Sequence, residues 1–153
     1  MALCGELWVN FMLMGEYHNN LDPKGRIVIP SKFREILGDS VVLTRGLDGC
    51  LFIYSVSEFQ RLTNELSNLS FTDKDSRNFV RFLLSGANTL EFDKQGRIVI
   101  PNYLKMYANL EKEVILVGVL NRIEVWSSCD WNNFMDSNFY ELSQISADLF
   151  NSN

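Results

Sequence analysis

Histidine is almost absent from this chain, since His18 is the only one among 153 residues. A Ser/His/Asp triad would have to use His18, and nothing in the sequence places a nucleophile beside it. Cysteine is scarce as well, because Cys4, Cys50 and Cys129 are far apart and form no Cys-x-x-Cys pair. This usage argues against a disulfide framework and against a Cys/His zinc site, and it fits a reducing, cytoplasmic setting.

Long apolar runs and phosphate-binding loops are also missing. No stretch reaches the roughly 18–20 apolar residues that would cross a bilayer, and there is no Walker loop or Gly-x-Gly-x-x-Gly motif. The paired carboxylates Asp73 and Asp75 stand at an expected helix start, where acids are favoured by the helix dipole. We therefore expect no enzyme: no catalytic residue, metal, cofactor, small-molecule substrate or membrane association.

Positive charge is in deficit, with 14 Lys and Arg against 19 Asp and Glu and a net charge of −5. The segment 128–153 holds four carboxylates and no Lys or Arg, so it accounts for four of those five charges. An acidic tail beside a nearly neutral body does not exclude a local anion-binding site, because charge distribution matters more than its sum.

The main feature present is a repeat. The sequence "DPKGRIVIP" at 22–30 returns 71 residues later as "DKQGRIVIP" at 93–101, and weaker similarity extends each copy to about seventy residues. Such a duplication predicts pseudo-twofold symmetry within one chain. Domains of this size are marginal alone, and no Pro- or Ser-rich linker separates the copies, so we expect them to share one core.

Each copy predicts the same order of elements. An extended segment (16–21; 88–92) leads into an Asp-x-x-Gly-Arg turn, in which Gly permits positive φ and Asp can accept a bond from the backbone. A short Ile-Val-Ile strand follows, and Pro30 or Pro101 ends it and can open a helix. Next comes a two-stranded hairpin, turning at Asp48-Gly49 in the first copy. A helix with Ser57 as its expected N-cap closes the first copy, and an acidic helical region closes the second.

These elements predict an α+β chain, mostly β, with enough short strands to close a small barrel surrounded by helices. We place an N-terminal extension at 1–11, with Met12 or Met14 as a possible natural start. The expected segments after it are a first repeat (12–66), a connecting helix (67–85) capped at Thr72 or Asp73, a second repeat (86–137) and an acidic C-terminal helix or tail (138–153).

Arg26 and Arg97 are the residues that turn-and-strand architecture does not require. One interpretation is structural: each could pair with Asp22 or Asp93, four residues earlier, or solubilise a sheet edge. The other is functional, because an arginine on an exposed tight turn can bind phosphate or guanine through its planar fork. Spacing alone leaves both interpretations open.

The two motifs "LDPKGRIVIPSKFR" and "FDKQGRIVIPNYLK", preceded by "MLMGEY", resemble the paired signature repeats of the MraZ family of bacterial transcriptional regulators. This family lies within the SpoVT/AbrB-like superfamily. The resemblance implies a double-split β-barrel with flanking helices and a ring-like homo-oligomer. It also implies a nucleoid-associated regulator that binds repeated DNA boxes upstream of its own gene, in a division and cell-wall gene cluster.

Carried onto this chain, the resemblance assigns DNA binding to the two turns. The first motif is complete, whereas the second has Gln95 at the place of Lys24, so we rank Lys24 and Arg26 above Arg97. The full expected set of DNA-binding residues is Lys24, Gly25, Arg26, Lys32, Arg34, Lys94 and Arg97. The alternative is a structural ring or antitoxin-like interaction protein, in which the repeats only build the barrel and the acidic C-terminal helix binds a protein.

Overall fold

The computed structural model describes residues 12–151, and the expected extension at 1–11 lies outside them. Within this range the chain forms eight strands and five helices. The strands are β1 (Leu13–Asn20), β2 (Arg26–Val28), β3 (Ser40–Arg45), β4 (Leu51–Ser55), β5 (Asn88–Glu91), β6 (Arg97–Val99), β7 (Glu113–Leu120) and β8 (Arg122–Ser127). The helices are α2 (Ser31–Leu37), α3 (Val56–Ser67), α4 (Lys74–Ser85), α5 (Asn102–Tyr107) and α6 (Ser128–Asn151).

The strands form two antiparallel sheets. Six of them lie in the order β1-β7-β8-β4-β3-β5, and β2 pairs with β6 in a separate two-stranded ribbon. This mixture of strands and helices agrees with the predicted α+β class. Among residues 12–151 no pairing joins the outer strands β1 and β5, so the closed double-split barrel stays a prediction.

The two repeats exchange their first strands. β1 of the first repeat pairs along its full length with β7 of the second, from Leu13↔Leu120 to Asn20↔Glu113. In return, β5 of the second repeat pairs with β3 of the first. β4 and β8 meet at the centre of the large sheet, so neither repeat has a complete sheet of its own.

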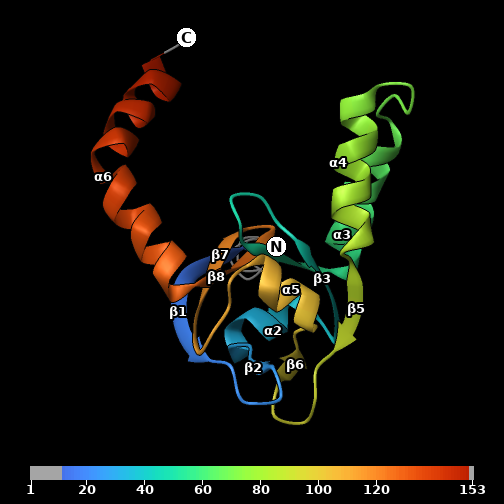
Figure 1. The fold of residues 1–153 in the computed structure, drawn as a ribbon, viewed down its shortest axis with the longest axis vertical. Coiled ribbons are helices and arrows are strands. Elements are labelled where there is room, and N and C mark those ends of the chain that lie inside the picture. The colour runs from blue at the N-terminus through green and yellow to red at the C-terminus, as the bar shows by residue number, and fades with distance from the viewer. Residues whose placement is uncertain (1–11, 152–153) are drawn as a thin grey trace, which may run out of the picture.

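Two hydrophobic clusters follow from this exchange, and each draws on both repeats. The smaller one contains Phe52, Tyr54 and Trp126, and the larger one is the main core. Its fully buried members come from equivalent positions of both motifs, such as Ile27 and Ile98 or Phe33 and Leu104. α2 and α5, which lie side by side in Figure 1, each contribute buried apolar side chains to it. The prediction of a shared core is therefore confirmed.

The local signals of the sequence place most element ends correctly. Pro30 and Pro101 stand at the N-caps of α2 and α5, one residue before each helix, and Gly38 ends α2 with φ +89°. Asp48 and Gly49, with φ +61° and +81°, make the predicted hairpin turn. Asp73 caps α4 by accepting a hydrogen bond from Ser76 N at 3.1 Å.

The predicted cap of α3 is wrong by two residues. The N-cap is Ser55, whose Oγ accepts a hydrogen bond from Glu58 N at 3.2 Å, and Ser57 already lies inside the helix. Because β4 runs directly into α3, the last strand residue also serves as the cap.

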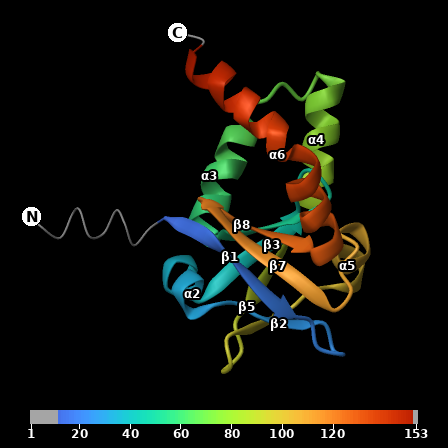
Figure 2. The same cartoon turned by 90° about the vertical axis from the view of Figure 1, so that its left-hand side faces the viewer.

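Two helical arms rise from the same end of the body (Figures 1 and 2). One is the antiparallel hairpin of α3 and α4, and the other is α6, which runs unbroken from Ser128 to Asn151. The turns that precede β2 and β6 project from the opposite end of the body (Figure 1). The acidic helix α6 is thus directed away from both turns.

Candidate nucleic-acid interface

Each Asp-x-x-Gly-Arg turn is held together by its own aspartate. Asp22 Oδ1 accepts hydrogen bonds from Lys24 N and Arg26 N, both at 2.9 Å, while Gly25 adopts φ +78°. Asp93 does the same for Gln95 N and Arg97 N at 2.9 Å. A short side chain that satisfies backbone N–H groups stabilises a tight turn. The Asp and Gly of the motif therefore have structural roles, as the sequence predicted.

The arginine of each turn forms an ion pair with that same aspartate. Arg26 Nε lies 2.5 Å from Asp22 Oδ2, and Arg97 Nε lies 2.7 Å from Asp93 Oδ2. Hydrogen bonds from the backbone N–H and the side chain of Arg26 hold the pKa of Asp22 below its ordinary value, and those of Arg97 lower the pKa of Asp93 in the same way. The pairing considered from spacing alone is therefore present in both turns.

The ion pair uses the Nε edge of each guanidinium, and the two arginines differ in what contacts their terminal nitrogens. In Arg97 the Nη2 atom also donates to Gln95 Oε1 at 3.3 Å. Arg26 has Lys24 at the equivalent place, and no partner among residues 12–151 accepts a hydrogen bond from its terminal nitrogens. The end-on edge of Arg26 is available for two parallel hydrogen bonds to an acceptor.

The β2–β6 ribbon brings the two arginines together. Arg26 lies opposite Val99, and Val28 lies opposite Arg97. Since strand residues alternate between faces, both arginines and both exposed valines share the outer face. Diagonal neighbours in such a pair are about 7–8 Å apart at their Cα atoms, which is the spacing expected between Arg26 and Arg97.

Each turn is also covered by a cation from the other repeat. A Cβ on Gly96 would come within 2.5 Å of Arg34 Cζ, and a Cβ on Gly25 would come within 3.3 Å of Lys105 Nζ. Arg34 and Lys105 occupy equivalent positions of α2 and α5, 71 residues apart. A Cβ at Gly96 would require the end of the Arg34 side chain to move, and one at Gly25 a smaller adjustment, in addition to the positive φ that favours glycine at both positions.

Lys105 is the one member of this group that the sequence reasoning missed. The repeat offset that pairs Arg26 with Arg97 also pairs Arg34 with Lys105, and applying that offset to every candidate cation would have found Lys105. Arg34 itself is partly engaged, because its Nε donates to Ile29 O at 2.9 Å. The remaining candidates, Lys24, Lys32 and Lys94, are exposed.

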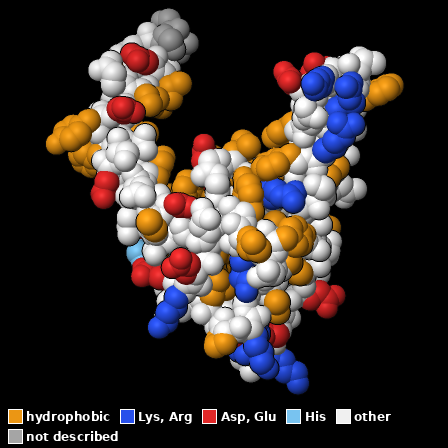
Figure 3. Space-filling view, in the orientation of Figure 1, with side chains coloured by type: hydrophobic (Ala, Val, Ile, Leu, Met, Phe, Trp, Pro, Cys, Tyr) orange, Lys and Arg blue, Asp and Glu red, His pale blue; other side chains and the backbone are white. Residues whose placement is uncertain are grey.

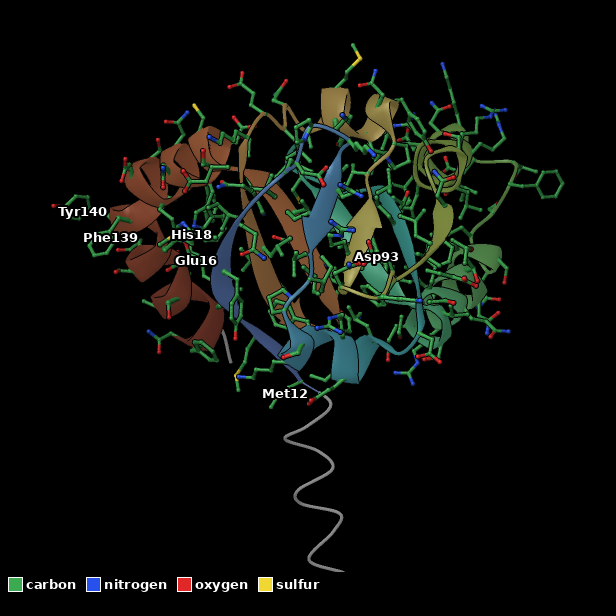
Figure 4. The ribbon with its side chains drawn as sticks, turned by 90° about the horizontal axis from the view of Figure 1, so that it is seen from below. Met12, Glu16, His18, Asp93, Phe139 and Tyr140 are labelled. Carbon is green, nitrogen blue, oxygen red and sulfur yellow. The ribbon has the colours of Figure 1, made fainter. Side chains whose placement is uncertain are left out.

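The end of the body that carries the turns is cationic. The two turns and the two side chains that cover them contribute six cations, against the two turn carboxylates, and Lys and Arg side chains are visible at this end in Figure 3. The six are Lys24, Arg26, Arg34, Lys94, Arg97 and Lys105. Figure 4 views this end directly, with Asp93 near the centre and α6 at the margin. A chain with a net charge of −5 thus carries a local group of cations at this end, and Figure 3 shows another on the α3–α4 arm.

Within residues 12–151 no group of three His, Cys, Asp or Glu side chains is arranged to hold a metal ion. No helix in that range is both long and apolar enough to span a bilayer.

Fold and site together define a duplicated α+β protein whose two Asp-x-x-Gly-Arg turns meet on one exposed, cationic ribbon. A family model described as "MraZ protein, putative antitoxin-like" matches the chain twice, over residues 12–82 and 83–153. The chain therefore belongs to the MraZ family.

Curated relatives carry the same family name. The protein named Transcriptional regulator MraZ of Halothermothrix orenii is 54% identical over 136 residues, covering 89% of this chain and 95% of the relative. Those of Alkaliphilus metalliredigens and Caldanaerobacter subterraneus are 51% and 48% identical, covering 88% and 93% of this chain and 94% and 99% of the relatives. These relatives are named as regulators and not as enzymes. A solved structure from Pyrococcus horikoshii, titled as PHS018, covers 71% of this chain and 91% of its own, but at 14% identity and a TM-score of 0.33 it supports no argument.

Proposed function

We propose that this chain is a sequence-specific DNA-binding transcriptional regulator that contacts DNA through the outer face of the β2–β6 ribbon. The observation that carries the proposal is the placement of Arg26 and Arg97 as diagonal neighbours on that face. The names of the curated relatives support regulation of transcription. As the family resemblance implies, the proposed target is repeated boxes upstream of the chain's own gene, in the nucleoid of the cytoplasm.

The dimensions of the ribbon suit the major groove of DNA. That groove is about 12 Å wide and admits a two-stranded β-ribbon. A Cα separation of about 7–8 Å matches roughly two base steps, since successive bases of one strand rise about 3.4 Å. We propose that Arg26 reads a base edge, with Arg97 as a second and weaker contact.

The ion pair with Asp22 prepares Arg26 for this contact. Because Nε is already held at 2.5 Å from Asp22 Oδ2, the side chain has lost rotamer freedom before DNA arrives, and less entropy is lost on binding. The terminal nitrogens remain for the O6 and N7 atoms of guanine or for a phosphate. The structural and functional interpretations of the arginine are thus compatible.

Around the two arginines, Lys24, Lys94 and Lys105 are proposed to contact phosphates, with Lys32 further out on α2. Arg34 is proposed mainly to support the second turn, because its Nε is held by Ile29 O. Each neutralised phosphate contributes about −0.9 to the slope of log affinity against log salt concentration. A few such contacts from one chain give weak binding, so we propose that a homo-oligomeric ring multiplies them, with a gain on the order of 10²–10⁴ from linked sites.

The test is fluorescence anisotropy with a duplex from upstream of the chain's own gene and an unrelated duplex, each across a salt series. Arg26→Ala should weaken specific binding by about 1–3 kcal/mol, or roughly 5- to 150-fold, and relax the preference between duplexes. Arg61→Ala on α3 is the matched control, because its side chain is 74% exposed and lies on an arm away from the turns.

Folding and assembly of each variant are checked by circular dichroism and sedimentation. Equal, weak binding of both duplexes by the wild-type chain, even at low salt, would reject the proposal. The Asp22–Arg26 pair would then be a device of turn architecture, and the acidic helix would become the place to seek a protein partner.

A further inference from the structure

The outer face of the β2–β6 ribbon carries two exposed valines beside its two arginines. Val28 lies directly opposite Arg97, and Val99 lies directly opposite Arg26. The two valines are 42% and 52% exposed, whereas the isoleucine that precedes each of them is buried. We call these four outward-facing residues the ribbon tetrad.

The valines are unusual for their place. The solvated face of an antiparallel sheet is normally polar, and apolar residues exposed singly elsewhere on a surface need no explanation. Here both lie within one cationic surface, on strands of three residues. The strands alone do not require valine, since threonine has the same branched shape and also favours strands. The fold therefore explains a β-branched residue at each position, but not an apolar one.

The arginines leave the valines uncovered. Each guanidinium is drawn to the aspartate of its own turn, and the side chains of Arg26 and Arg97 are only 30% and 25% exposed. The exposed fractions of Val28 and Val99 are larger than these. A partner that reaches both guanidinium groups therefore also meets the methyl groups of the valines.

The backbone that carries the valines is fixed on several sides. Val28 O accepts a hydrogen bond from Asn19 Nδ2 at 2.7 Å. Ile29 N donates to Gly96 O at 3.0 Å, and the equivalent bond of the other repeat measures 2.9 Å. Valine side chains are themselves stiff at χ1. Contact with a partner thus costs the ribbon little conformational entropy.

The base edges of the major groove present one apolar group. Guanine, cytosine and adenine offer hydrogen-bond donors and acceptors there, whereas thymine adds its C5 methyl group. Apolar side chains contact that methyl group in specific complexes. The minor groove is about half as wide and presents no methyl group. In the major groove, an apolar position between two arginines therefore corresponds to thymine.

We propose that Val28 and Val99 are specificity-determining residues, which select thymine through its methyl group beside the bases that Arg26 and Arg97 contact. Directly opposite residues of an antiparallel pair have Cβ atoms about 4.5–5.5 Å apart. Residues two apart in one strand are separated by about 6.6 Å. Both separations correspond to one or two base steps of about 3.4 Å, so the selected thymine lies within two steps of an arginine contact.

This inference deepens the proposed function and rests on it. The arginine fork discriminates between bases by hydrogen bonds, and the valines add discrimination by apolar contact. A valine placed against the polar edge of another base deprives a donor or acceptor of its water without replacing it. The selection of thymine thus has an attractive and a repulsive component.

Replacement of thymine by deoxyuridine tests the contact, because it removes the methyl group and keeps every hydrogen-bonding group of the base. In the duplex from upstream of the chain's own gene, each thymine is replaced in turn. Fluorescence anisotropy with the full chain should show a loss of affinity of about fourfold at each contacted thymine, the value for one methyl-sized group. Replacement at the other thymines should have no effect.

A variant assigns the methyl contact to the valines. Val28→Ser with Val99→Ser removes the apolar groups from two exposed positions, and deoxyuridine should then cause no further loss. Val56→Ser is the matched control, because Val56 is 47% exposed at the start of α3, on the arm away from the turns. It should keep the wild-type response. Circular dichroism and sedimentation check each variant, and the scan of the wild-type chain is independent of their folding.

The inference is overturned if deoxyuridine at every position binds the wild-type chain as well as thymine does. That result is expected if the valines cover a protein surface or act as a wedge in the minor groove. A response to deoxyuridine that persists in the serine variant overturns it as well. Failure of the proposed function is distinguishable, since the unsubstituted and unrelated duplexes would then bind equally, and the inference would fail with it.

Discussion

The guanidinium of Arg34 lies directly over Gly96, the turn glycine of the other repeat, so closely that a Cβ at Gly96 would come within 2.5 Å of Arg34 Cζ. The equivalent pair, Lys105 over Gly25, is looser, since its nearest contacts to an added Cβ are 3.3 Å. The two turns, which have nearly the same sequence, therefore differ in how closely the covering side chain packs against the turn glycine. The difference arises because one covering cation is a broad guanidinium and the other a slender ammonium.

Gly96→Ala should destabilise the chain more than Gly25→Ala. Both changes place a side chain at positive φ, +76° and +78°, which costs roughly 1–2 kcal/mol. At Gly96 the new methyl group also displaces Arg34 from Ile29 O, so about 1 kcal/mol is added for that hydrogen bond. Urea unfolding measures both values.

A double-mutant cycle with Arg34→Ala isolates the contact. The penalty of Gly96→Ala should fall by about 1 kcal/mol in that background, because the displaced group is gone. Simple additivity of the two changes would show that Arg34 does not limit the space above Gly96.

Lys105→Ala should weaken DNA binding although this residue lies outside both Asp-x-x-Gly-Arg turns. Its ammonium lies at the first turn beside Gly25, where it is proposed to contact a phosphate. We expect a reduction in affinity that is similar for specific and unrelated duplexes, with a salt slope smaller by about 1. Arg61→Ala on the α3 arm is again the control, and an unchanged slope in Lys105→Ala would remove this residue from the interface.

Ser55→Ala should cost about 1 kcal/mol of folding free energy, because the helix α3 loses the side chain that caps Glu58 N. Ser57→Ala removes a hydroxyl from an exposed position two residues on, and should change stability by less than about 0.5 kcal/mol. Thermal or urea unfolding of the two variants compares them directly. An equal loss in both would mean that the hydroxyl pair, 3.2 Å apart, acts as a unit.

His18 should make folding stability depend on pH near neutrality. Its imidazole ring lies between two carboxylates. Nδ1 is 3.3 Å from Glu113 Oε1, and Nε2 is 3.0 Å from Glu16 Oε1. Hydrogen bonds to Glu113 and then to Glu16 raise the pKa of His18 above 6.5. Because the folded pKa is the higher one, the stabilisation is complete below pH 6.5 and is lost as the pH rises through the folded pKa.

The histidine ring signals in an NMR titration measure that pKa, and urea midpoints at pH 6 and pH 8 measure its consequence. The chain should be more stable at pH 6, and His18→Gln should reduce that difference. A titration midpoint at or below 6.5 would contradict the expected shift.

Much of the fold could be predicted because its signals are local. Asp22, Gly25 and Pro30 act on backbone atoms within a few residues of themselves, so their pattern determines a turn, a strand end and a helix start wherever it occurs. The duplication made each signal appear twice, and it pointed to Arg26 and Arg97 as the side chains that the architecture does not explain.

The sequence could not show how the copies interlock. β1 pairs with β7 about a hundred residues away and not with its own hairpin. The sequence LMGEYHNN of β1 does not indicate which distant strand it will pair with. The position of Lys105 over Gly25 depends on that exchange, as does the diagonal approach of the two arginines on the β2–β6 ribbon. Local chemistry therefore determined the turns, whereas long-range strand pairing decided that both turns open on one surface and both arms on the other.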